Sequence, residues 1–439
     1  SRAADVLENV LAPRPAARCR EHIKPVASPR AKRATGAARR RPSRRQVNVA
    51  MRALLPSGAP AASSIFTVCG HSSGGSMASQ HAVAFSDRVA GLGHFQAASW
   101  GCSRLINKST EDYNQRCANS TASHAMAALV ASAFERGDIS SPTNLRQMPI
   151  FYYAGEWDTI VEPATVRAAA GFYQLLSERV VGLTVEGAEH AFVTGANCSE
   201  CNACWYLGPP FLNDCRYDMA GHMLAHLLGA LSPAVPAPSR RLHRLKQSPY
   251  FPANASCADL GMGPHAFLYL PRGCRSGRGV CRLHVVYHGC SSSVVAIGST
   301  ALVLHAGFNP WAEANLVMVL YPQSRGGLCW DWTGTYTPHK NELYDTRRSA
   351  QLLVVNRMVD AVQGELPLDP CLEPTCEAEY GAERRRQATK RQTRRRCSKK
   401  KSLGLCRLGR GLPWRTGCRG LPAALPCHSV QLLPYSHYC

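Results

Sequence analysis

Residues 67–80 read TVCGHSSGGSMASQ and contain the pattern G-x-S-x-G around Ser72. Enzymes with a serine nucleophile use this pattern to place the serine on a tight turn between a strand and a helix. Glycines flank the serine because such a turn leaves no room for side chains. Ser72 is therefore a candidate nucleophile. The alternative is a strand-to-helix turn without chemistry, because the pattern also arises by chance.

A serine nucleophile needs a base, and the base needs a carboxylate to orient it. When the serine lies on such a turn, the acid and then the histidine follow it along the chain. Asp158 follows an apolar strand predicted within residues 148–158, and His190 follows a short strand predicted at 182–186. We expect Asp158 and His190 to be the partners of Ser72. Glu156 and Glu189 are rival carboxylates, which we expect at the surface.

Ester cleavage also needs two backbone N–H groups directed at the oxygen that becomes negatively charged. One should come from Ser73, the residue after the nucleophile, and the other from a His-Gly loop after a strand. No such loop precedes Ser72, but His288-Gly289-Cys290 ends an apolar strand predicted at 282–289. A circular permutation that moves the first strands behind the histidine accounts for this order.

Strands and helices alternate through the middle of the chain. Beside the strands already named, further strands are predicted at 64–68, 266–271 and 315–322, and helices at 74–87, 124–137, 162–178, 217–231 and 349–362. A Pro-rich connector occupies 232–241. This alternation predicts an α/β fold in which helices cover both faces of a mostly parallel sheet.

The charge of the chain lies at its two ends. The 439 residues have a net charge of +22, of which +11 lies in residues 1–60 and +11 in residues 371–439. We interpret 1–60 and 371–439 as disordered basic segments and 61–370 as the catalytic domain. The ends could instead bind an anionic surface or nucleic acid, but no nucleic-acid motif accompanies them. No stretch is apolar over the roughly 18 residues of a membrane span.

The chain has 20 cysteines, 12 of them within 61–370, and four N-x-S/T sequons. Such cysteine usage favours an oxidising compartment, so we expect secretion. The run CSECNAC at 198–204 could ligate a metal, but this context favours disulfides. We predict no metal and no cofactor. Cys69 is expected to be a buried apolar residue.

The region from residue 64 to about 362 resembles the extracellular poly(3-hydroxybutyrate) depolymerases of the circularly permuted, single-domain type. The resemblance lies in ordered segments that include GHSSGGSMASQHAVAFSDRVAGLG, MPIFYYAGEWDTIVEP, EHAF, CRLHVVYHGC, FNPWAEANLVMVLYPQ and GLCWDWTG. It implies an α/β-hydrolase-like fold.

The same resemblance implies roles for individual residues. Ser72, Asp158 and His190 would form the catalytic triad. The N–H groups of Ser73 and Cys290 would form the oxyanion hole. Aromatic residues near Trp330 and Trp332 would help to line a polyester-binding cleft.

Two positions depart from the family pattern. Ser292 stands where the family has Gln, and Thr333 where it usually has a further Trp. Four disulfides are expected: Cys102–Cys117, Cys198–Cys215, Cys274–Cys281 and Cys290–Cys329.

The first hypothesis is a secreted serine esterase that hydrolyses poly(3-hydroxybutyrate)-type polyesters through an acyl-enzyme. Its alternative is a carboxylesterase for small or plant-derived esters, which the two departures keep open. A second class of function is an inactive hydrolase scaffold that binds a partner through its basic ends. The sequence indicates no oligomeric state.

Overall fold

The computed structural model describes residues 65–106, 112–196, 198–274, 281–326, 328–336 and 343–364. The basic segments expected at 1–60 and 371–439 lie outside the described residues, as do the two ends of the expected catalytic domain, 61–64 and 365–370.

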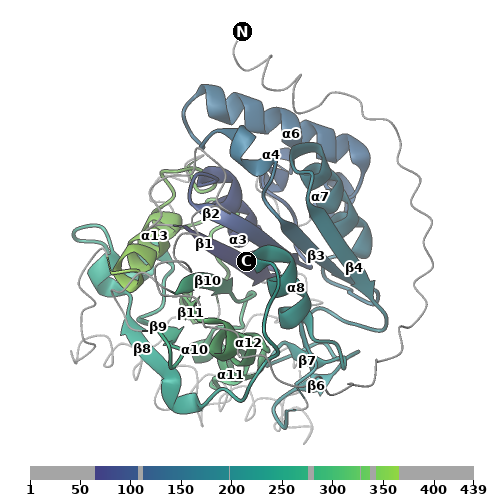
Figure 1. Ribbon diagram of the computed structural model, residues 1–439. Coiled ribbons are helices and arrows are strands. Elements are labelled where there is room, and N and C mark those ends of the chain that lie inside the picture. The colour runs from purple at the N-terminus through teal and green to yellow at the C-terminus, as the bar shows by residue number, and fades with distance from the viewer. Residues whose placement is uncertain are drawn as a thin grey trace, which may run out of the picture.

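A central sheet of eight strands has the order β4-β3-β2-β1-β10-β11-β9-β8 (Figure 1). Neighbours from β4 to β11 pair in parallel, and β9 runs antiparallel to both β11 and β8. The predicted α/β fold with a mostly parallel sheet is confirmed. The strands are β1 (Phe66–His71), β2 (Val89–Phe95), β3 (Ile150–Gly155), β4 (Val180–Val185), β8 (Leu242–Lys246), β9 (His265–Tyr269), β10 (Arg282–Tyr287) and β11 (Val317–Tyr321).

A small second sheet has the order β5-β7-β6 and consists of β5 (Phe192–Thr194), β7 (Leu212–Asp214) and β6 (Asn202–Ala203). The helices are α3 (Ser73–Ala84), α4 (Cys102–Leu105), α5 (Tyr113–Arg116), α6 (Ser120–Glu135), α7 (Pro163–Leu176), α8 (Met219–Leu228), α9 (Cys257–Leu260), α10 (Val294–Ile297), α11 (Ala301–His305), α12 (Phe308–Asn315) and α13 (Ala350–Val362). Short 3₁₀ turns lie at η1 (Pro142–Leu145), η2 (Ser239–Arg241) and η3 (Ser248–Tyr250). None of the helices in the described part of the chain is long and apolar enough to cross a bilayer.

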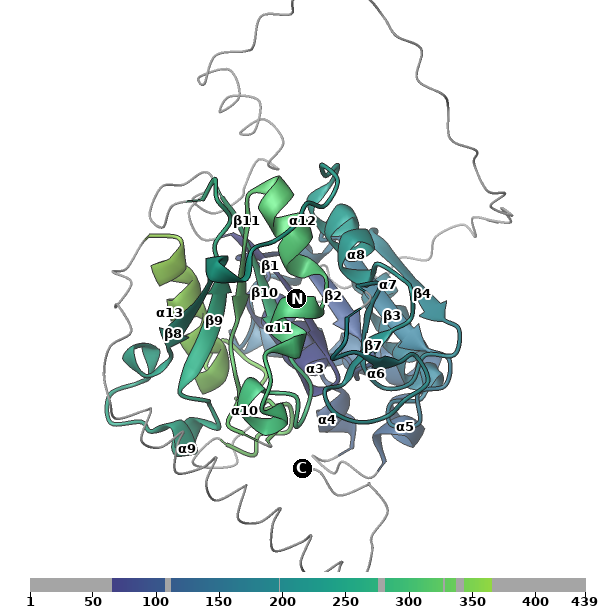
Figure 2. The ribbon, with the colours of Figure 1, turned by 90° about the horizontal axis from the view of Figure 1, so that it is seen from below.

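The central sheet separates two apolar cores. Successive strand residues point to opposite faces, so Val68 packs with residues of α3, α6, α7 and α13, whereas Cys69 packs with residues of α8 and α12. Figures 1 and 2 show these helices on the two sides of the sheet. Cys69 is fully buried without a disulfide, as predicted.

The strand order places β10 beside β1, although more than 200 residues separate the two strands along the chain. β10 pairs with β1 in the register Cys69↔Val286 and Gly70↔Tyr287. The turn after β1 and the loop after β10 therefore leave the sheet side by side, at the edge where the parallel strands end. The circular permutation inferred from the sequence predicts that these two loops are neighbours.

Two strands of the central sheet were not predicted. β2, with the sequence VAGLGHF, contains two glycines, which are weak strand formers. A Cβ atom on Gly93 would lie 2.6 Å from the Cβ of Cys69 and 2.6 Å from the sulfur of Met223. Glycine is needed there because the neighbouring strand and α8 approach so closely. β8 begins directly after the Pro-rich connector and forms an edge of the sheet.

Candidate active site

Ser72 lies on the turn between β1 and α3, in a backbone conformation with φ 57° and ψ −129°. A positive φ is strained for a residue with a side chain and persists only where the surroundings fix it. Here the Ser72 N–H donates to the carbonyl of Phe95 at 3.0 Å, and the Ser72 carbonyl accepts from the N–H of Gly75 at 2.8 Å. The turn is thereby tied to both β2 and α3.

The two glycines of the G-x-S-x-G pattern are required by close approaches of the backbone. A Cβ atom on Gly70 would lie 2.1 Å from the carbonyl oxygen of Gly74. A Cβ atom on Gly74 would lie 2.3 Å from the carbonyl oxygen of His288. The first glycine lets the turn close, and the second lets the loop after β10 lie against the first turn of α3.

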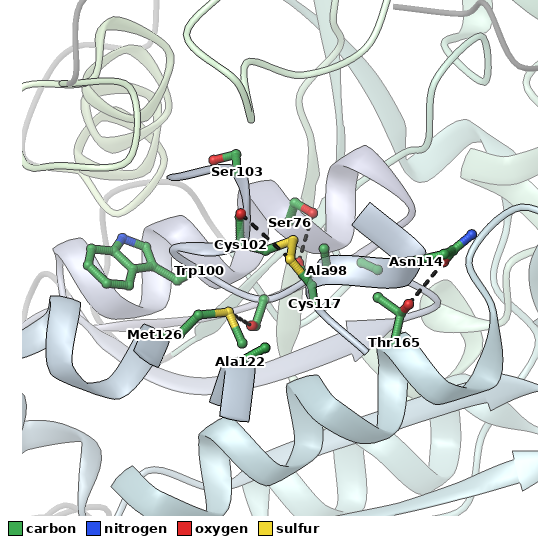
Figure 3. Close-up of a disulfide and its surroundings, with 12 residues drawn as sticks. Ser76, Ala98, Trp100, Cys102, Ser103, Asn114, Cys117, Ala122, Met126 and Thr165 are labelled. Atoms are coloured by element: carbon green, nitrogen blue, oxygen red, sulfur yellow. Dashed lines mark hydrogen bonds between the residues drawn. A yellow bond between two sulfur atoms is a disulfide. The ribbon is translucent and has the colours of Figure 1, made fainter. Parts of the chain in front are cut away.

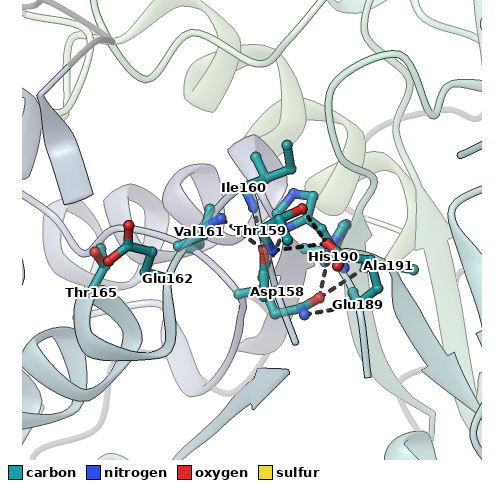
Figure 4. Close-up of polar contacts among 12 residues, drawn as sticks. Asp158, Thr159, Ile160, Val161, Glu162, Thr165, Glu189, His190 and Ala191 are labelled. Atoms are coloured by element: carbon teal, nitrogen blue, oxygen red, sulfur yellow. Dashed lines mark hydrogen bonds and ion pairs between the residues drawn. The ribbon is translucent and has the colours of Figure 1, made fainter. Parts of the chain in front are cut away.

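Asp158 and His190 are in direct contact (Figure 4). His190 Nδ1 lies 2.9 Å from Asp158 Oδ2, and both side chains are buried. The other carboxylate oxygen of Asp158 accepts the backbone N–H groups of Ile160 at 2.9 Å and Val161 at 2.8 Å. These bonds fix the carboxylate, which in turn orients the imidazole ring and can stabilise its protonated form.

His190 also lies next to the turn that carries Ser72. The rings of His190 and His71 have centroids 4.5 Å apart. Because His71 immediately precedes Ser72, this contact places the candidate base beside the turn of the candidate nucleophile. The structure thus gathers the three residues that the sequence singled out, from the loops after β1, β3 and β4.

The two rival carboxylates lie in different environments. Glu156 is exposed, as expected, and accepts the N–H of Gly187 at 2.9 Å. The expectation that Glu189 is a surface residue was wrong, because its side chain is buried. Glu189 Oε1 accepts the N–H and the hydroxyl of Thr159, each at 2.9 Å, and the backbone N–H of His190 at 3.0 Å. It joins the acid loop to the histidine loop and has no hydrogen bond with the imidazole ring.

The loop His288-Gly289-Cys290 lies directly against Ser72, since a Cβ atom on Gly289 would be 3.2 Å from the Cβ of Ser72. The His288 ring is a hydrogen-bonded part of this loop. Its Nε2 accepts the N–H of Ser324 at 3.0 Å, so its Nδ1 carries the proton and donates to the carbonyl of Gly289 at 2.7 Å. Burial lowers the pKa of His288 to about 4, so the ring stays neutral.

This arrangement fixes the direction of one peptide unit. The carbonyl of Gly289 and the N–H of Cys290 belong to the same planar peptide and point in opposite directions. By holding the Gly289 carbonyl, the His288 ring determines where the Cys290 N–H points. No pattern in the sequence indicated this role of His288.

The disulfide Cys290–Cys329, which was predicted, ties this loop to the segment that contains Trp330. Trp330 is only 1% exposed, and its indole N–H donates to the carbonyl of His288 at 2.9 Å. Its backbone N–H contacts Ser73 Oγ at 3.4 Å. Trp330 therefore supports the loop from within, whereas the half-buried Trp332 reaches the surface.

Trp332 faces a segment that is held by another predicted disulfide, Cys102–Cys117 (Figure 3). Its ring packs edge-to-face on Tyr113, with centroids 6.1 Å apart. Beside this disulfide, Ser76 Oγ of α3 donates to the carbonyl of Ala98 at 2.8 Å. The segment that leads to this disulfide is thus tied to the helix that follows Ser72.

The two positions that depart from the family pattern are both buried. The Ser292 hydroxyl donates to the carbonyl of Cys290 at 3.0 Å, and the Thr333 hydroxyl lies 2.8 Å from that of Thr335. Both side chains bond within their own loops.

Cys274–Cys281 is present as predicted, but the predicted Cys198–Cys215 pair was wrong. The structure has Cys198–Cys201 and Cys204–Cys215 instead. The register of the small sheet explains this outcome, because β6 pairs with β7 as Ala203↔Asp214 and so places the next residues of both strands side by side. All three cysteines of the C-x-x-C-x-x-C run are therefore in disulfides.

Exposed aromatic side chains surround the histidine loop. Trp157 is 56% exposed and lies beside this loop, because its N–H donates to the carbonyl of Ala188 at 3.0 Å. Trp205 and Tyr206 are 62% and 44% exposed, and the carbonyl of Cys204 just before them accepts the N–H of Glu189 at 3.1 Å. We call Trp157, Trp205 and Tyr206 the aromatic rim.

Comparison with known proteins adds to this geometry. No family model matches the chain. A polyhydroxybutyrate depolymerase of Talaromyces funiculosus is 32% identical over 319 residues, which are 68% of this chain and 90% of the relative. A poly(3-hydroxybutyrate) depolymerase of Delftia acidovorans is 32% identical over 326 residues, which are 70% of this chain and 62% of the relative.

Two solved structures are similar to the chain with a TM-score of 0.60, each covering 68% of this chain and 96% of the other. One is a PHB depolymerase from Penicillium funiculosum, which is 30% identical, and the other is a serine-to-alanine variant of a PHB depolymerase complexed with an R3HB trimer, which is 28% identical. The fold, the strained serine turn and the similarity to these relatives all indicate the same family. The chain belongs to the polyhydroxybutyrate depolymerase family and is a carboxylic ester hydrolase.

Proposed function

We propose that this chain is a secreted serine esterase that hydrolyses poly(3-hydroxybutyrate)-type polyesters through Ser72, His190 and Asp158. The observation that carries the proposal is the 2.9 Å contact between His190 Nδ1 and Asp158 Oδ2, beside a serine on a strained strand-to-helix turn. The names of the relatives support the class of substrate. The disulfides among the described residues support secretion.

In the first half of the reaction, His190 Nε2 takes the proton of the Ser72 hydroxyl, and Ser72 Oγ forms a bond to the ester carbonyl carbon. The backbone N–H groups of Ser73 and Cys290 donate to the carbonyl oxygen as it becomes negative. The ester C–O bond then breaks, and His190 returns the proton to the leaving alcohol. The product of this half is an acyl group on Ser72.

In the second half, His190 takes a proton from water, and the resulting oxygen attacks the acyl carbon. Ser72 leaves and recovers the proton from His190, and the acid product is released. Asp158 stays ionised throughout and stabilises the imidazolium that forms twice in each cycle. The neutral His288 ring keeps the Cys290 N–H in position during both steps.

The aromatic rim supports a polymeric substrate. Exposed aromatic side chains beside an active site offer large apolar contact areas. Trp157, Trp205 and Tyr206 provide such areas next to the histidine loop, and Trp332 provides a further one on the segment held by Cys290–Cys329. A polyester repeat has apolar surface between its ester groups and would lie on these rings.

The test compares the wild-type chain with its Ser72→Ala variant on two substrates, a poly(3-hydroxybutyrate) suspension and a soluble butyrate ester. We expect the wild type to clear the suspension and cleave the ester, and the variant to do neither. Ester cleavage without clearing would move the substrate to small esters, the alternative that the departures at Ser292 and Thr333 keep open. A folded wild type that does neither would refute the esterase and favour a binding scaffold.

A further inference from the structure

Gln96 is a buried residue that follows β2, beside the serine turn. Its backbone N–H donates to the carbonyl of Tyr153 at 2.9 Å, and the preceding carbonyl, of Phe95, accepts the N–H of Ser72. Its φ is 42°, a left-handed conformation that is uncommon for a residue with a side chain. The backbone conformation aims the Gln96 side chain at the histidine loop.

The Gln96 amide bonds to the residues on both sides of the candidate base. Its Nε2 donates to the carbonyl of Glu189 at 3.0 Å, and its Oε1 accepts the N–H of Ala191 at 3.1 Å. A backbone N–H can only donate and a carbonyl can only accept, so these partners fix which end of the amide is oxygen. Gly155 leaves the room for this amide, since a Cβ atom there would lie 2.3 Å from Gln96 Nε2.

The same amide oxygen reaches the residue before the nucleophile. His71 Nε2 lies 3.0 Å from Gln96 Oε1, and because that oxygen is an acceptor, Nε2 must carry the proton. The other ring nitrogen, Nδ1, is buried without a hydrogen-bond partner in the described part of the chain. His71 is therefore in one defined tautomer, with its ring against that of His190 at a centroid distance of 4.5 Å.

A neutral ring at this place is compatible with a base that becomes positively charged. Burial, and then the nearby His190, hold the pKa of His71 well below its usual value. The ring can thus pack against the imidazolium of His190 without like-charge repulsion. If the His71 ring were positively charged, it would oppose protonation of His190.

We propose that Gln96 is a positioning residue for His190, which it holds by its two neighbouring peptide units and connects through His71 to the turn that carries Ser72. The inference rests on the proposed triad. The contact with Asp158 sets the rotation of the His190 imidazole ring about its side-chain bonds. The Gln96 amide instead fixes the backbone from which this side chain projects. Misplacing a reacting group by about 1 Å can cost 10²-fold in rate, so this second restraint matters for catalysis.

The test uses the full chain with Gln96→Met, which keeps the length of the side chain and removes all three hydrogen bonds. We expect kcat for a soluble butyrate ester to fall roughly 10- to 100-fold while KM changes less than about threefold. The matched control is Asn309→Leu, which removes another buried amide that donates to the carbonyl of Val303 at 2.8 Å and accepts from Tyr321 Oη at 2.7 Å. Asn309→Leu should lower stability but leave kcat within about twofold.

Gln96→Glu adds a readout that a purely structural role would not move. The titratable groups around the amide are His71, His190, Glu189, Asp158 and Tyr153. A carboxylate at 96 cannot donate to the carbonyl of Glu189, and its charge, next to His71 Nε2, favours a second proton on His71 and so changes the charge that faces His190. We expect the acid limb of the pH profile of kcat/KM to differ from that of the wild type, whereas Asn309→Leu should leave it in place.

The inference is overturned if Gln96→Met keeps the wild-type kcat, or loses no more of it than Asn309→Leu does. If Gln96→Met fails to fold, Gln96→Glu decides alone, because it preserves size and two of the three bonds, and an unmoved acid limb refutes the inference. An inactive wild type would instead refute the proposed function, so the two failures are distinguishable.

Discussion

Replacing Asp158 by Asn tests the assignment of the acid most directly. The variant keeps the shape of the side chain, and its oxygen can still accept the N–H groups of Ile160 and Val161. Its NH₂ group, however, would face His190 Nδ1, which must then lose its proton to accept a hydrogen bond. The proton would move to Nε2, the nitrogen that must be free to accept the proton of Ser72.

The expected loss follows from the contact distance. Two unit charges 2.9 Å apart attract by about 6 kcal/mol at an effective dielectric constant of roughly 20. This is the stabilisation of the imidazolium that the variant forfeits, and it corresponds to a fall in kcat of about 10⁴-fold. We expect KM for a soluble butyrate ester to change little, because Asp158 acts on the charge that develops during the reaction.

Steady-state kinetics on the butyrate ester measure this loss, with thermal unfolding as the check that the variant is folded. Glu189→Gln is the matched control, because Glu189 is the other buried acid of the site and has no hydrogen bond with the His190 ring. It should lose less than about tenfold in kcat. The reasoning is refuted if Asp158→Asn keeps a tenth of the wild-type activity, or if the control loses as much as Asp158→Asn.

Three further changes have defined outcomes. The double variant Cys290→Ala with Cys329→Ala removes the disulfide that closes a 39-residue loop, so the free energy of unfolding measured in urea should fall by about 4 kcal/mol. The variant should also have a lower kcat, and an unchanged kcat would contradict the role of the His288-Gly289-Cys290 loop. Trp157→Ala with Trp205→Ala should slow the clearing of polymer about tenfold and leave cleavage of the soluble ester within twofold; equal effects on both would argue against a polymer contact. Burial raises the pKa of Asp331 to about 6, so its contribution to stability is greatest below pH 4 and falls by about 3 kcal/mol as the pH rises to 6 and above. Asp331→Asn should remove this slope from unfolding curves measured between pH 4 and 7, and a retained slope would assign it to another group.

The sequence was sufficient where chemistry requires a residue type at a fixed place. The serine turn could be predicted because its glycines are imposed by backbone contacts within the turn and with the neighbouring loop. The loops that carry Asp158 and His190 could be predicted because each follows an apolar strand. The permuted order could be inferred because a His-Gly loop occurred only downstream.

What escaped prediction depends on contacts between distant segments. β2 was not predicted because Gly93 is required by the close packing of α8 and not by any preference for a strand. The role of Gln96 was not predicted either, because its position becomes clear only once β2 is recognised as a strand. Glu189 looked like a surface acid because its partner Thr159 lies 30 residues away. The pairing of Cys204 with Cys215 depends on the register of two very short strands, which no local pattern specifies.

The pairing of β1 with β10 has a consequence for how the protein is made. Thr67 Oγ1 and His284 Nδ1 are 2.8 Å apart although they are 217 residues apart along the chain. At ribosomal rates of about 5–20 residues per second, β1, the strand that precedes Ser72, waits roughly 10 to 40 s for its neighbour. During that interval the serine turn lacks one side of its site, and β1 has an unpaired edge. The proposed site can thus be completed only after β10 has been synthesised, and until then the unpaired edge of β1 is open to pairing with other chains.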